Sequence, residues 1–334
     1  MSTKAITHRP VRVICLGEIL FDCLADELGK SVSEVSSWTP YPGGAPANTA
    51  SALVKLGTPV AFIGCVGKDT QGNELVQLLQ SIDVNTTGIQ YNSQVPTRQV
   101  YVTRNADGDR TFAGFGTRQP DQFADAYLQA QYLPDSLFLE AEYLVLGTLE
   151  LAYPQTRAAV FRALELAEEY HLKIVLDVNW RPMFWLDQEE ALPLIKQLWK
   201  YIDYLKLSKE EALWLFDTAD AGTISAHLDS VEGVLVSNGD AAVSYCINEH
   251  QGTVEPIKVS VQDTTGAGDA FLAGFIHQLC LQGTQMLDRA EVVKHIVNYA
   301  CIVGGLTTTK SGAIAAQPTP KEVAMLLQSN QLVK

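Results

Sequence analysis

The stretch YLVLGTLELAYPQTRAAVFRALELAEEYHLKIVLDVN, residues 143–179, contains the repeating unit of the predicted fold. Its two ends, 143–147 and 173–179, are apolar runs of strand length, and the segment 154–170 between them has the apolar spacing of an amphipathic helix. Strands that are apolar throughout are typical of a parallel sheet covered on both faces. The stretch therefore predicts a strand–helix–strand unit with parallel strands.

The same alternation extends in both directions along the chain. A helix is expected to begin after Gly43-Gly44 and to end at Gly57, and another to span 69–82 with Asp69 as its N-cap. Further strands are expected at 11–17, 59–67, 204–208 and 233–239, and further helices at 187–199 and 209–216. We therefore predict an α/β fold in which helices flank a doubly wound, mostly parallel sheet.

Two segments, about 18–42 and 92–117, depart from this alternation. Within the second, residues 97–115 have the pattern of a β-hairpin with Asp107-Gly108 in the turn. We interpret both segments as inserts that form a small β-sheet lid on a single domain spanning residues 1–334.

Composition is that of an ordinary globular protein: 334 residues, of which 47% are hydrophobic and 19% charged. The net charge of −14, from 24 basic and 38 acidic residues, argues against a general nucleic-acid-binding protein, which would need a basic face. It places no limit on a small anionic ligand, because a binding site is local. No apolar run approaches the roughly 20 residues of a membrane span. We expect a cytoplasmic protein with no nucleic-acid or membrane partner.

The six cysteines are spread along the chain without a CxxC pair, and most lie in apolar runs. This distribution favours reduced, buried thiols over a disulfide framework or a zinc site. The cysteines are Cys15, Cys23, Cys65, Cys246, Cys280 and Cys301.

Polar residues follow four of the predicted strands, at the edge of the sheet where open α/β proteins bind ligands. One such cluster is weak support for a site, whereas four on the same edge are harder to dismiss. The residues are Asp177, Asn179 and Arg181; Ser208 and Glu211; Ser237 and Gly239; and, after a strand expected at 257–261, Asp263 and Thr265.

Residues 263–275, DTTGAGDAFLAGF, combine a glycine turn with the start of a very apolar helix. The helix is expected to begin near Asp269, and the backbone N–H groups of Gly266, Ala267 and Gly268 would form an anion hole at its positive end. A carboxylate beside an anion hole suits phosphoryl transfer to an alcohol, with Asp269 as general base. The alternative is that Asp269 only caps the helix and the glycines only permit tight packing.

A second motif, GGAPANTASALVKLGTPVAFIGCVG at 43–67, completes a pair of signatures. Together they resemble those of the ribokinase-like sugar kinases of the phosphofructokinase-B type, in the same order and with the same succession of elements from about residue 11 to 315. The resemblance implies that Asp269 deprotonates the acceptor hydroxyl and that residues 266–268 form the anion hole. The sugar-binding positions that it implies are Asp22, Gly43, Gly44 and Asn48.

The resemblance also implies positions for ATP and its metal ions. Asp263 and Thr265 match part of a monovalent-cation site that usually holds potassium. Glu211 matches an acidic residue that acts indirectly on Mg²⁺, but Ser208 stands where the family has asparagine, which leaves metal or phosphate affinity in question. The remaining nucleotide contacts that it implies are Ser237, Gly239, Gly268 and Asn298.

Two short motifs indicate which sugar is the substrate. GEILFD (17–22) and DVNWRPMFW (177–185) resemble fructokinases, which makes Asp177, Asn179 and Arg181 substrate-binding candidates. The pattern D-x-N-x-R is also that of 2-keto-3-deoxygluconate kinases, in which arginine would bind a carboxylate. Asp22 favours a neutral sugar, because its charge would repel an acid.

We therefore expect ATP-dependent phosphorylation of a primary hydroxyl, with D-fructose as substrate and fructose 6-phosphate as product. The alternatives are 2-keto-3-deoxygluconate, another sugar of this kinase type, a nucleoside, or a kinase-fold binding protein without catalysis. In such kinases the lid often doubles as a dimer surface, so a homodimer through the lid is a further expectation to test.

Overall fold

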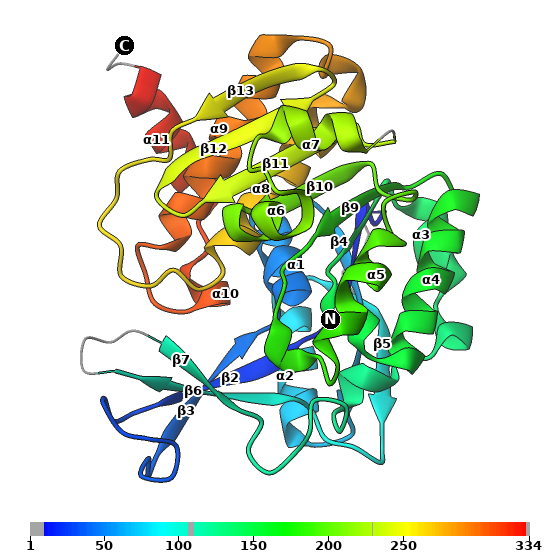
Figure 1. Cartoon of the computed structure of the whole chain (residues 1–334), viewed down its shortest axis with the longest axis vertical. Coiled ribbons are helices and arrows are strands. Elements are labelled where there is room, and N and C mark those ends of the chain that lie inside the picture. Colours follow the sequence, from blue (N-terminus) through cyan, green and yellow to red (C-terminus); the bar gives the residue numbers. More distant parts are fainter. Residues whose placement is uncertain (1–9, 106–109, 229, 332–334) are drawn as a thin grey trace, which may run out of the picture.

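The computed structural model describes residues 10–105, 110–228 and 230–331. A nine-stranded sheet in the order β13-β12-β11-β10-β9-β8-β1-β4-β5 runs through the larger part of the protein (Figure 1). Its strands are β1 (Val13–Leu16), β4 (Val60–Gly67), β5 (Asn85–Asn92), β8 (Tyr143–Leu146), β9 (Lys173–Asp177), β10 (Tyr204–Ser208), β11 (Gly233–Asn238), β12 (Ala241–Ile247) and β13 (His250–Val254).

The strands from β5 to β11 are all parallel, and only β12 and β13 are antiparallel additions at one edge. Side chains of β1 alternate between the two faces: Val13 and Cys15 join one apolar core, and Ile14 and Leu16 join the other. Since both faces are buried, the strands carry apolar residues throughout, as the sequence predicts. The predicted α/β fold with a mostly parallel sheet is confirmed.

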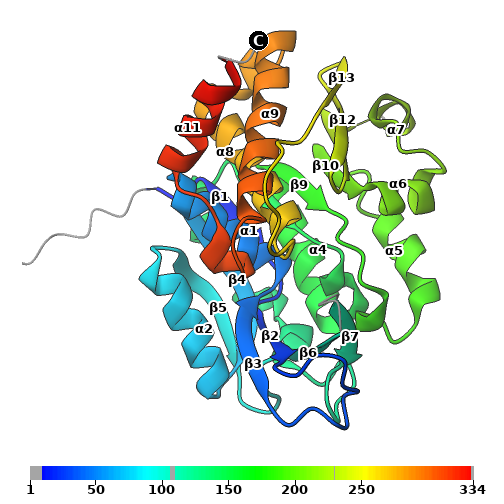
Figure 2. The ribbon, with the colours of Figure 1, turned by 90° about the vertical axis from the view of Figure 1, so that its left-hand side faces the viewer.

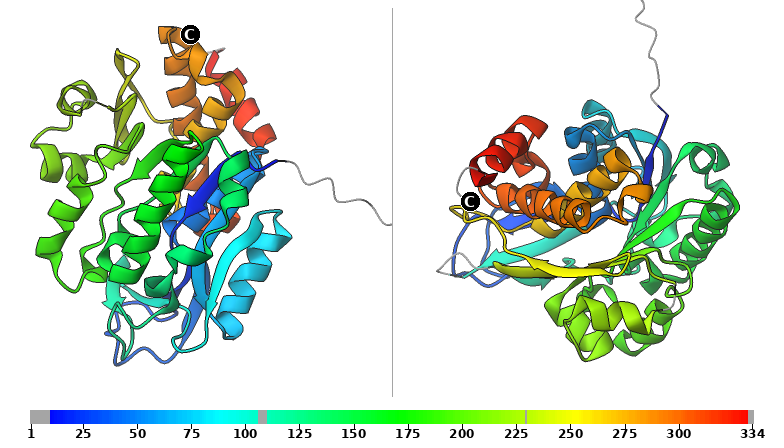
Figure 3. Two further views of the ribbon diagram at one scale, coloured as in Figure 1. Left: turned by 90° about the vertical axis from the view of Figure 1, so that its right-hand side faces the viewer. Right: turned by 90° about the horizontal axis from the view of Figure 1, so that it is seen from above.

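Helices cover both faces of the sheet (Figures 2 and 3). One layer contains α1 (Ala45–Leu56), α2 (Thr70–Ser81), α8 (Ala267–Gln282), α9 (Ala290–Thr307) and α11 (Pro320–Gln331). The other contains α3 (Asp135–Glu140), α4 (Pro154–Glu169), α5 (Ala191–Lys196), α6 (Lys209–Phe216) and α7 (Ala221–His227). The short helix α10 (Ala313–Ala316) lies beside α1, and Lys55 in the last turn of α1 donates to the carbonyl of Ile314.

A separate four-stranded sheet projects from the carboxyl edge of the large sheet (Figure 1). Its order is β3-β2-β6-β7, with β2 (Leu20–Ala25), β3 (Trp38–Gly43), β6 (Gln99–Arg104) and β7 (Arg110–Gly114). It is built from the two segments that the sequence sets apart, and the predicted hairpin is present as the antiparallel pair β6–β7. The predicted turn residues Asp107 and Gly108 lie outside the described residues.

Two predicted elements differ in the structure. The helix expected at 187–199 is a 3₁₀ turn (Gln188–Glu190) followed by α5, because Pro193 lacks the N–H that an α-helix starting at 187 would need at that position. The strand expected at 257–261 is wrong: this segment joins no sheet, and the backbone N–H groups of Gln262 and Asp263 instead donate to the carbonyl of Thr308.

The cysteine prediction is confirmed, because all six thiols are free and buried. Within the described residues, no helix combines the length and apolar character needed to cross a membrane.

Candidate active site

A cavity of about 490 Å³ opens where the carboxyl edge of the large sheet faces the four-stranded sheet. The small sheet contributes Leu20, Val100, Val102 and Phe112 to its wall, so the cavity has an apolar side. The cavity wall also brings together nine residues that the sequence singles out, of which only Asp22 comes from the small sheet: Asp22, Gly44, Asn48, Asn179, Arg181, Thr265, Gly266, Gly268 and Asp269.

Asp269 stands in the first turn of α8, whose N-cap is Gly266 rather than a residue next to Asp269. Gly266 has φ 75°, and a Cβ there would lie 2.8 Å from the Cβ of Ala313, so both conformation and space require glycine. The N–H group of Ala267 donates to the carbonyl of Thr264 over 3.2 Å, and no side chain caps this 16-residue helix, which leaves the N–H groups of Gly266 and Gly268 at its positive end. The two glycines present no side chain of their own to an anion that approaches this backbone.

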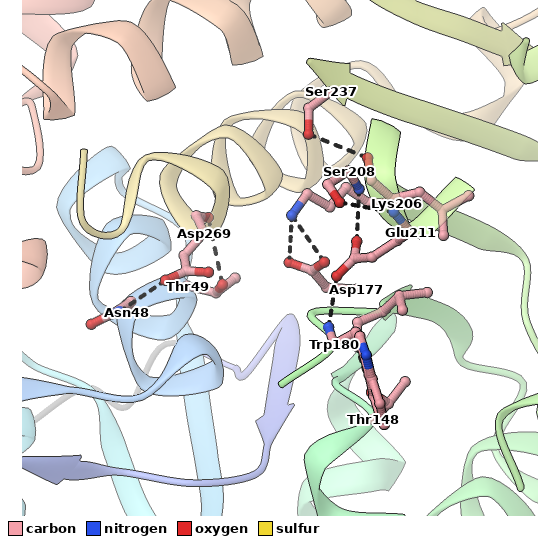
Figure 4. A network of polar contacts seen from close by, with 12 residues as sticks. Asn48, Thr49, Thr148, Asp177, Trp180, Lys206, Ser208, Glu211, Ser237 and Asp269 are labelled. Atoms are coloured by element: carbon pink, nitrogen blue, oxygen red, sulfur yellow. Dashed lines mark hydrogen bonds and ion pairs between the residues drawn. The ribbon is translucent and has the colours of Figure 1, made fainter. Parts of the chain in front are cut away.

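The Asp269 carboxylate is held by α1. Asn48 Nδ2 donates to Asp269 Oδ2 over 2.8 Å, and α1 and α8 pack side by side (Figure 4). Burial raises the pKa of Asp269 above its ordinary value, although the Asn48 bond and the charges of Lys206 and Arg181 act in the opposite direction. A carboxylate with a raised pKa is a better proton acceptor, which is what a general base requires.

Asn48 also presents an unused acceptor. Its side chain is 5% exposed, and its Oδ1 has no hydrogen-bond partner among the described residues. A buried carbonyl oxygen without a donor is costly, so a ligand hydroxyl in the cavity would satisfy it. Gly44, the N-cap of α1, has φ 104° and lies against the backbone of Glu18, which explains why the chain needs glycine there.

Lys206 in the middle of β10 and Asp177 at the end of β9 form a buried ion pair. Lys206 Nζ lies 2.9 and 3.0 Å from the two Asp177 oxygens, and the two residues are 7% and 5% exposed (Figure 4). Burial raises the pKa of Asp177 to about 6, with Lys206 opposing the shift. Among the described residues, Asp177 is not part of the cavity wall, whereas Lys206 is.

Ser208 and Glu211 form a capping box at the start of α6. Glu211 Oε2 accepts from the Ser208 N–H over 2.7 Å, and the Glu211 N–H donates to Ser208 Oγ over 3.2 Å. Glu211 Oε1 accepts from the Trp180 N–H over 2.6 Å. Both oxygens of Glu211 therefore organise backbone at the ends of β9 and β10.

Of the residues expected to contact the nucleotide, Gly268 lines the cavity, whereas Ser237, Gly239 and Asn298 lie outside its wall. Ser237 Oγ donates to the carbonyl of Leu207 over 3.2 Å, and Gly239 is exposed with φ 57° in the turn between β11 and β12. Asn298 is half-buried on α9.

Asp263 orders the loop in front of α8. Its Oδ1 accepts from the N–H and Oγ1 of Thr265, at 3.0 and 2.7 Å, and its Oδ2 accepts from the N–H of Gly312 at 2.9 Å. The carboxylate thus joins the segments before α8 and before α10.

Comparison with known proteins identifies this arrangement. Residues 11–320 match the pfkB family of carbohydrate kinases. The chain belongs to the pfkB family. The chain is 33% identical to fructokinase-2 of Solanum habrochaites over 319 residues, which covers 95% of this chain and 96% of that protein. It is also 33% identical to probable fructokinase-2 of Arabidopsis thaliana, with 95% of each chain covered.

Solved structures of this kinase type superpose closely on the chain. The fructokinase of Xylella fastidiosa with bound ATP has a TM-score of 0.87 and 28% identity, and covers 96% of this chain and 99% of that one. A fructokinase double mutant of Vibrio cholerae O395 bound to fructose, ADP and a potassium ion has a TM-score of 0.82 and 27% identity, with 95% and 98% covered. The predicted assignment to the ribokinase-like carbohydrate kinases is confirmed.

This carbohydrate kinase also carries site residues that the sequence reasoning missed. Lys206 stands inside an apolar strand and so matches no ligand-binding pattern, although a lone lysine in a buried strand is itself a signal for a paired charge. Glu18 and Glu150 were not assigned either. They form a buried carboxyl pair next to the cavity, in which Glu18 Oε1 accepts from the Ala45 N–H over 2.7 Å and Glu150 Oε1 from the Glu18 N–H over 3.0 Å.

Proposed function

We propose that the chain phosphorylates D-fructose with ATP, giving fructose 6-phosphate and ADP. The observation that carries this proposal is the Asp269 carboxylate, which lies at the anion-binding turn of α8 and beside the unsatisfied oxygen of Asn48 in one cavity. A base, an anion hole and an acceptor for a hydroxyl are the three groups that transfer of a phosphoryl group to a sugar requires.

In the proposed reaction the primary hydroxyl of fructose approaches Asp269. Because Oδ2 of Asp269 accepts from Asn48, its other oxygen takes the hydroxyl proton. A bond forms between the sugar oxygen and the γ-phosphorus, and the bond from that phosphorus to the bridging oxygen breaks, so that ADP leaves with the electron pair. The N–H groups of the Gly266–Gly268 turn stabilise charge on the transferring group.

The four-stranded sheet serves as the lid in this proposal. It supplies the apolar wall of the cavity through Val100, Val102 and Phe112. Closure of this wall over the sugar would exclude water, which would otherwise accept the phosphoryl group. A homodimer through the lid remains a prediction.

The site has oxygen donors suited to the metal ions of such kinases. Asp263 and Thr265 would hold a potassium ion next to the anion-binding turn, as expected for a hard cation. Glu211 has both oxygens engaged by backbone N–H groups, so it would hold Mg²⁺ through water. When bound, Mg²⁺ neutralises phosphate charge during transfer.

The choice of fructose rests on Asp22 and on the relatives. Asp22 lines the cavity, where a carboxylate suits sugar hydroxyls and repels an acid substrate. Arg181 lines the same cavity and is exposed, so it could instead recognise the carboxylate of 2-keto-3-deoxygluconate. The fructokinases of Solanum and Arabidopsis, at 33% identity over nearly their whole length, favour the neutral sugar.

An ADP-release assay with Mg²⁺, with and without K⁺, tests the proposal on a panel of acceptors: fructose, ribose, 2-keto-3-deoxygluconate, fructose 6-phosphate and adenosine. Turnover of fructose above the others supports it. If only the sugar acid is turned over, the mechanism stands and Arg181 becomes the carboxylate contact. Failure with fructose, with turnover of another acceptor, rejects fructose as the substrate.

The Asp269→Asn variant tests the base. Asparagine keeps the size and an oxygen acceptor for Asn48, but it cannot take a proton. We expect kcat to fall by about 10²- to 10⁴-fold, the usual contribution of general-base catalysis, with sugar affinity nearly unchanged. A variant with the wild-type kcat would show that Asp269 is not the base.

A further inference from the structure

The cavity contains one buried cation that the proposed reaction has not used, the ammonium of Lys206. It lines the cavity, and a Cβ added to Gly268 would lie 3.2 Å from its Nζ, so the ammonium faces the anion-binding turn itself. Figure 4 shows Lys206 reaching from β10 toward the N-terminal end of α8. The distance places it beside any anion that binds the turn.

Asp177 accounts for only part of the hydrogen bonding of Lys206. An ammonium has three N–H donors, and the two oxygens of Asp177 accept from it at 2.9 and 3.0 Å. The third N–H remains for an oxygen in the cavity. Asp177 also fixes the position of the ammonium, because a buried, doubly bonded lysine has little rotameric freedom.

The negative charges around the Lys206 ammonium favour a cation at this position. Three carboxylates, those of Asp177, Glu211 and Asp269, act on Lys206 and raise its pKa against the effect of burial, so the amine stays protonated. A phosphoryl group brings further negative charge into the same region. Arg181 is exposed and donates to the Trp180 carbonyl over 3.0 Å, so it is less firmly placed than Lys206.

We infer that Lys206 is a catalytic residue that donates a hydrogen bond to the transferring phosphoryl group, and that Asp177 is a positioning residue for Lys206 rather than a sugar contact. Lys206 keeps its proton throughout and stabilises the charge that the phosphoryl oxygens carry during transfer. The inference rests on the proposed function in requiring phosphoryl transfer at this cavity, but not on the identity of the sugar.

The test is a set of four variants: Lys206→Met, Asp177→Asn, the double variant Lys206→Met/Asp177→Asn, and Lys173→Met as control. Lys173 is also paired with carboxylates, Asp203 and Glu232, but at the opposite end of β9. kcat and KM are measured with the sugar that the panel identifies, and folding is followed by urea unfolding.

We expect Lys206→Met to lower kcat by about 10²- to 10³-fold, the effect of losing one preorganised donor, with KM for the sugar within threefold of wild type. Asp177→Asn should lower kcat by less than Lys206→Met does. It should leave KM for the sugar within threefold of the wild-type value. Lys173→Met should leave kcat unchanged.

The double variant separates catalysis from structure. Lys206→Met alone leaves the Asp177 carboxylate buried and unpaired, and could lower activity through misfolding. Removing both charges restores folding, but on our inference kcat stays as low as in Lys206→Met. Recovery of kcat in the double variant, or a Lys206→Met variant with kcat near wild type, would overturn the catalytic role. Turnover of a sugar other than fructose would reject only the proposed substrate.

Discussion

The buried pair of Arg98 and Asp125 gives the sharpest prediction about stability. Arg98 Nε and Nη2 donate to the two Asp125 oxygens over 2.6 and 2.8 Å, and the side chains are 0% and 5% exposed. The guanidinium also lies 4.7 Å from the centre of the Phe123 ring and 5.1 Å from that of Phe184, which lines the cavity. The pair is thus a charged bridge inside an aromatic cluster.

Replacing Arg98 with methionine leaves the Asp125 carboxylate without its cation at a site that water does not reach. Uncompensated burial of one member of such a pair costs about 3–5 kcal/mol, a large fraction of the stability of an ordinary domain. Urea unfolding, followed by tryptophan fluorescence and circular dichroism, measures this loss. The control is Arg162→Met, because Arg162 forms an exposed i,i+3 pair with Glu165 and should change stability by less than about 0.5 kcal/mol.

A double variant tests whether the loss of stability comes from leaving the Asp125 charge unpaired. Arg98→Met/Asp125→Leu removes both members, so it should be more stable than Arg98→Met alone by at least about 2 kcal/mol. If Arg98→Met lost no more stability than the exposed control, or if the double variant gained nothing over the single one, the assignment of a buried, mutually dependent ion pair would be refuted.

Three further predictions concern conformation and protonation. Gly44→Ala should raise KM for the sugar and destabilise the fold, because Gly44 has φ 104° and an added Cβ would lie 2.5 Å from the Glu18 carbonyl oxygen. The control is Gly57→Ala, which has a similar φ of 101° but no atom within 4 Å of the added Cβ, and it should lower stability by only about 1 kcal/mol. Burial first, and then the charge of Glu150, raises the pKa of Glu18, so its stabilising effect is complete at low pH and is lost as pH rises through that pKa. Glu18→Gln, which mimics the protonated acid, should therefore lose less stability than wild type as pH rises above about 4.5 in unfolding titrations. Burial lowers the pKa of His277 from 6.5 to about 4, so the free energy of unfolding should fall by roughly 3 kcal/mol as the pH is lowered from about 6.5 to 4. A His277→Gln variant whose stability depends on pH as steeply as that of the wild type would contradict this.

The sequence predicts the features that depend on local chemistry. Gly44 and Gly57 mark the ends of α1 because both positions need a positive φ, and Asp69 caps α2 by accepting from the Gly72 N–H. The parallel strands follow from their uniformly apolar composition. The same chemistry explains why Gly266 precedes α8.

Features that depend on tertiary partners escape prediction. Residues 257–261 alternate like a strand, but no strand in the described part of the chain pairs with them. Asp177 follows an apolar run as a ligand-binding residue would, yet its partner is Lys206 from the next strand. The pairing of Glu18 with Glu150, which are 132 residues apart, has no signal in either local sequence.

The contact between α1 and α8 has a consequence for protein synthesis. Asn48 and Asp269, joined by a hydrogen bond, are separated by 221 residues. Domains fold on the ribosome from the N-terminus onward, and contacts of long sequence separation form late. In the nascent chain, the face of α1 that carries Asn48 is therefore exposed long before Asp269 is translated. Chains that terminate prematurely before α8 would keep Asn48 but lack Asp269, the base that we propose, so we expect enzymatic activity only from chains whose translation has passed α8.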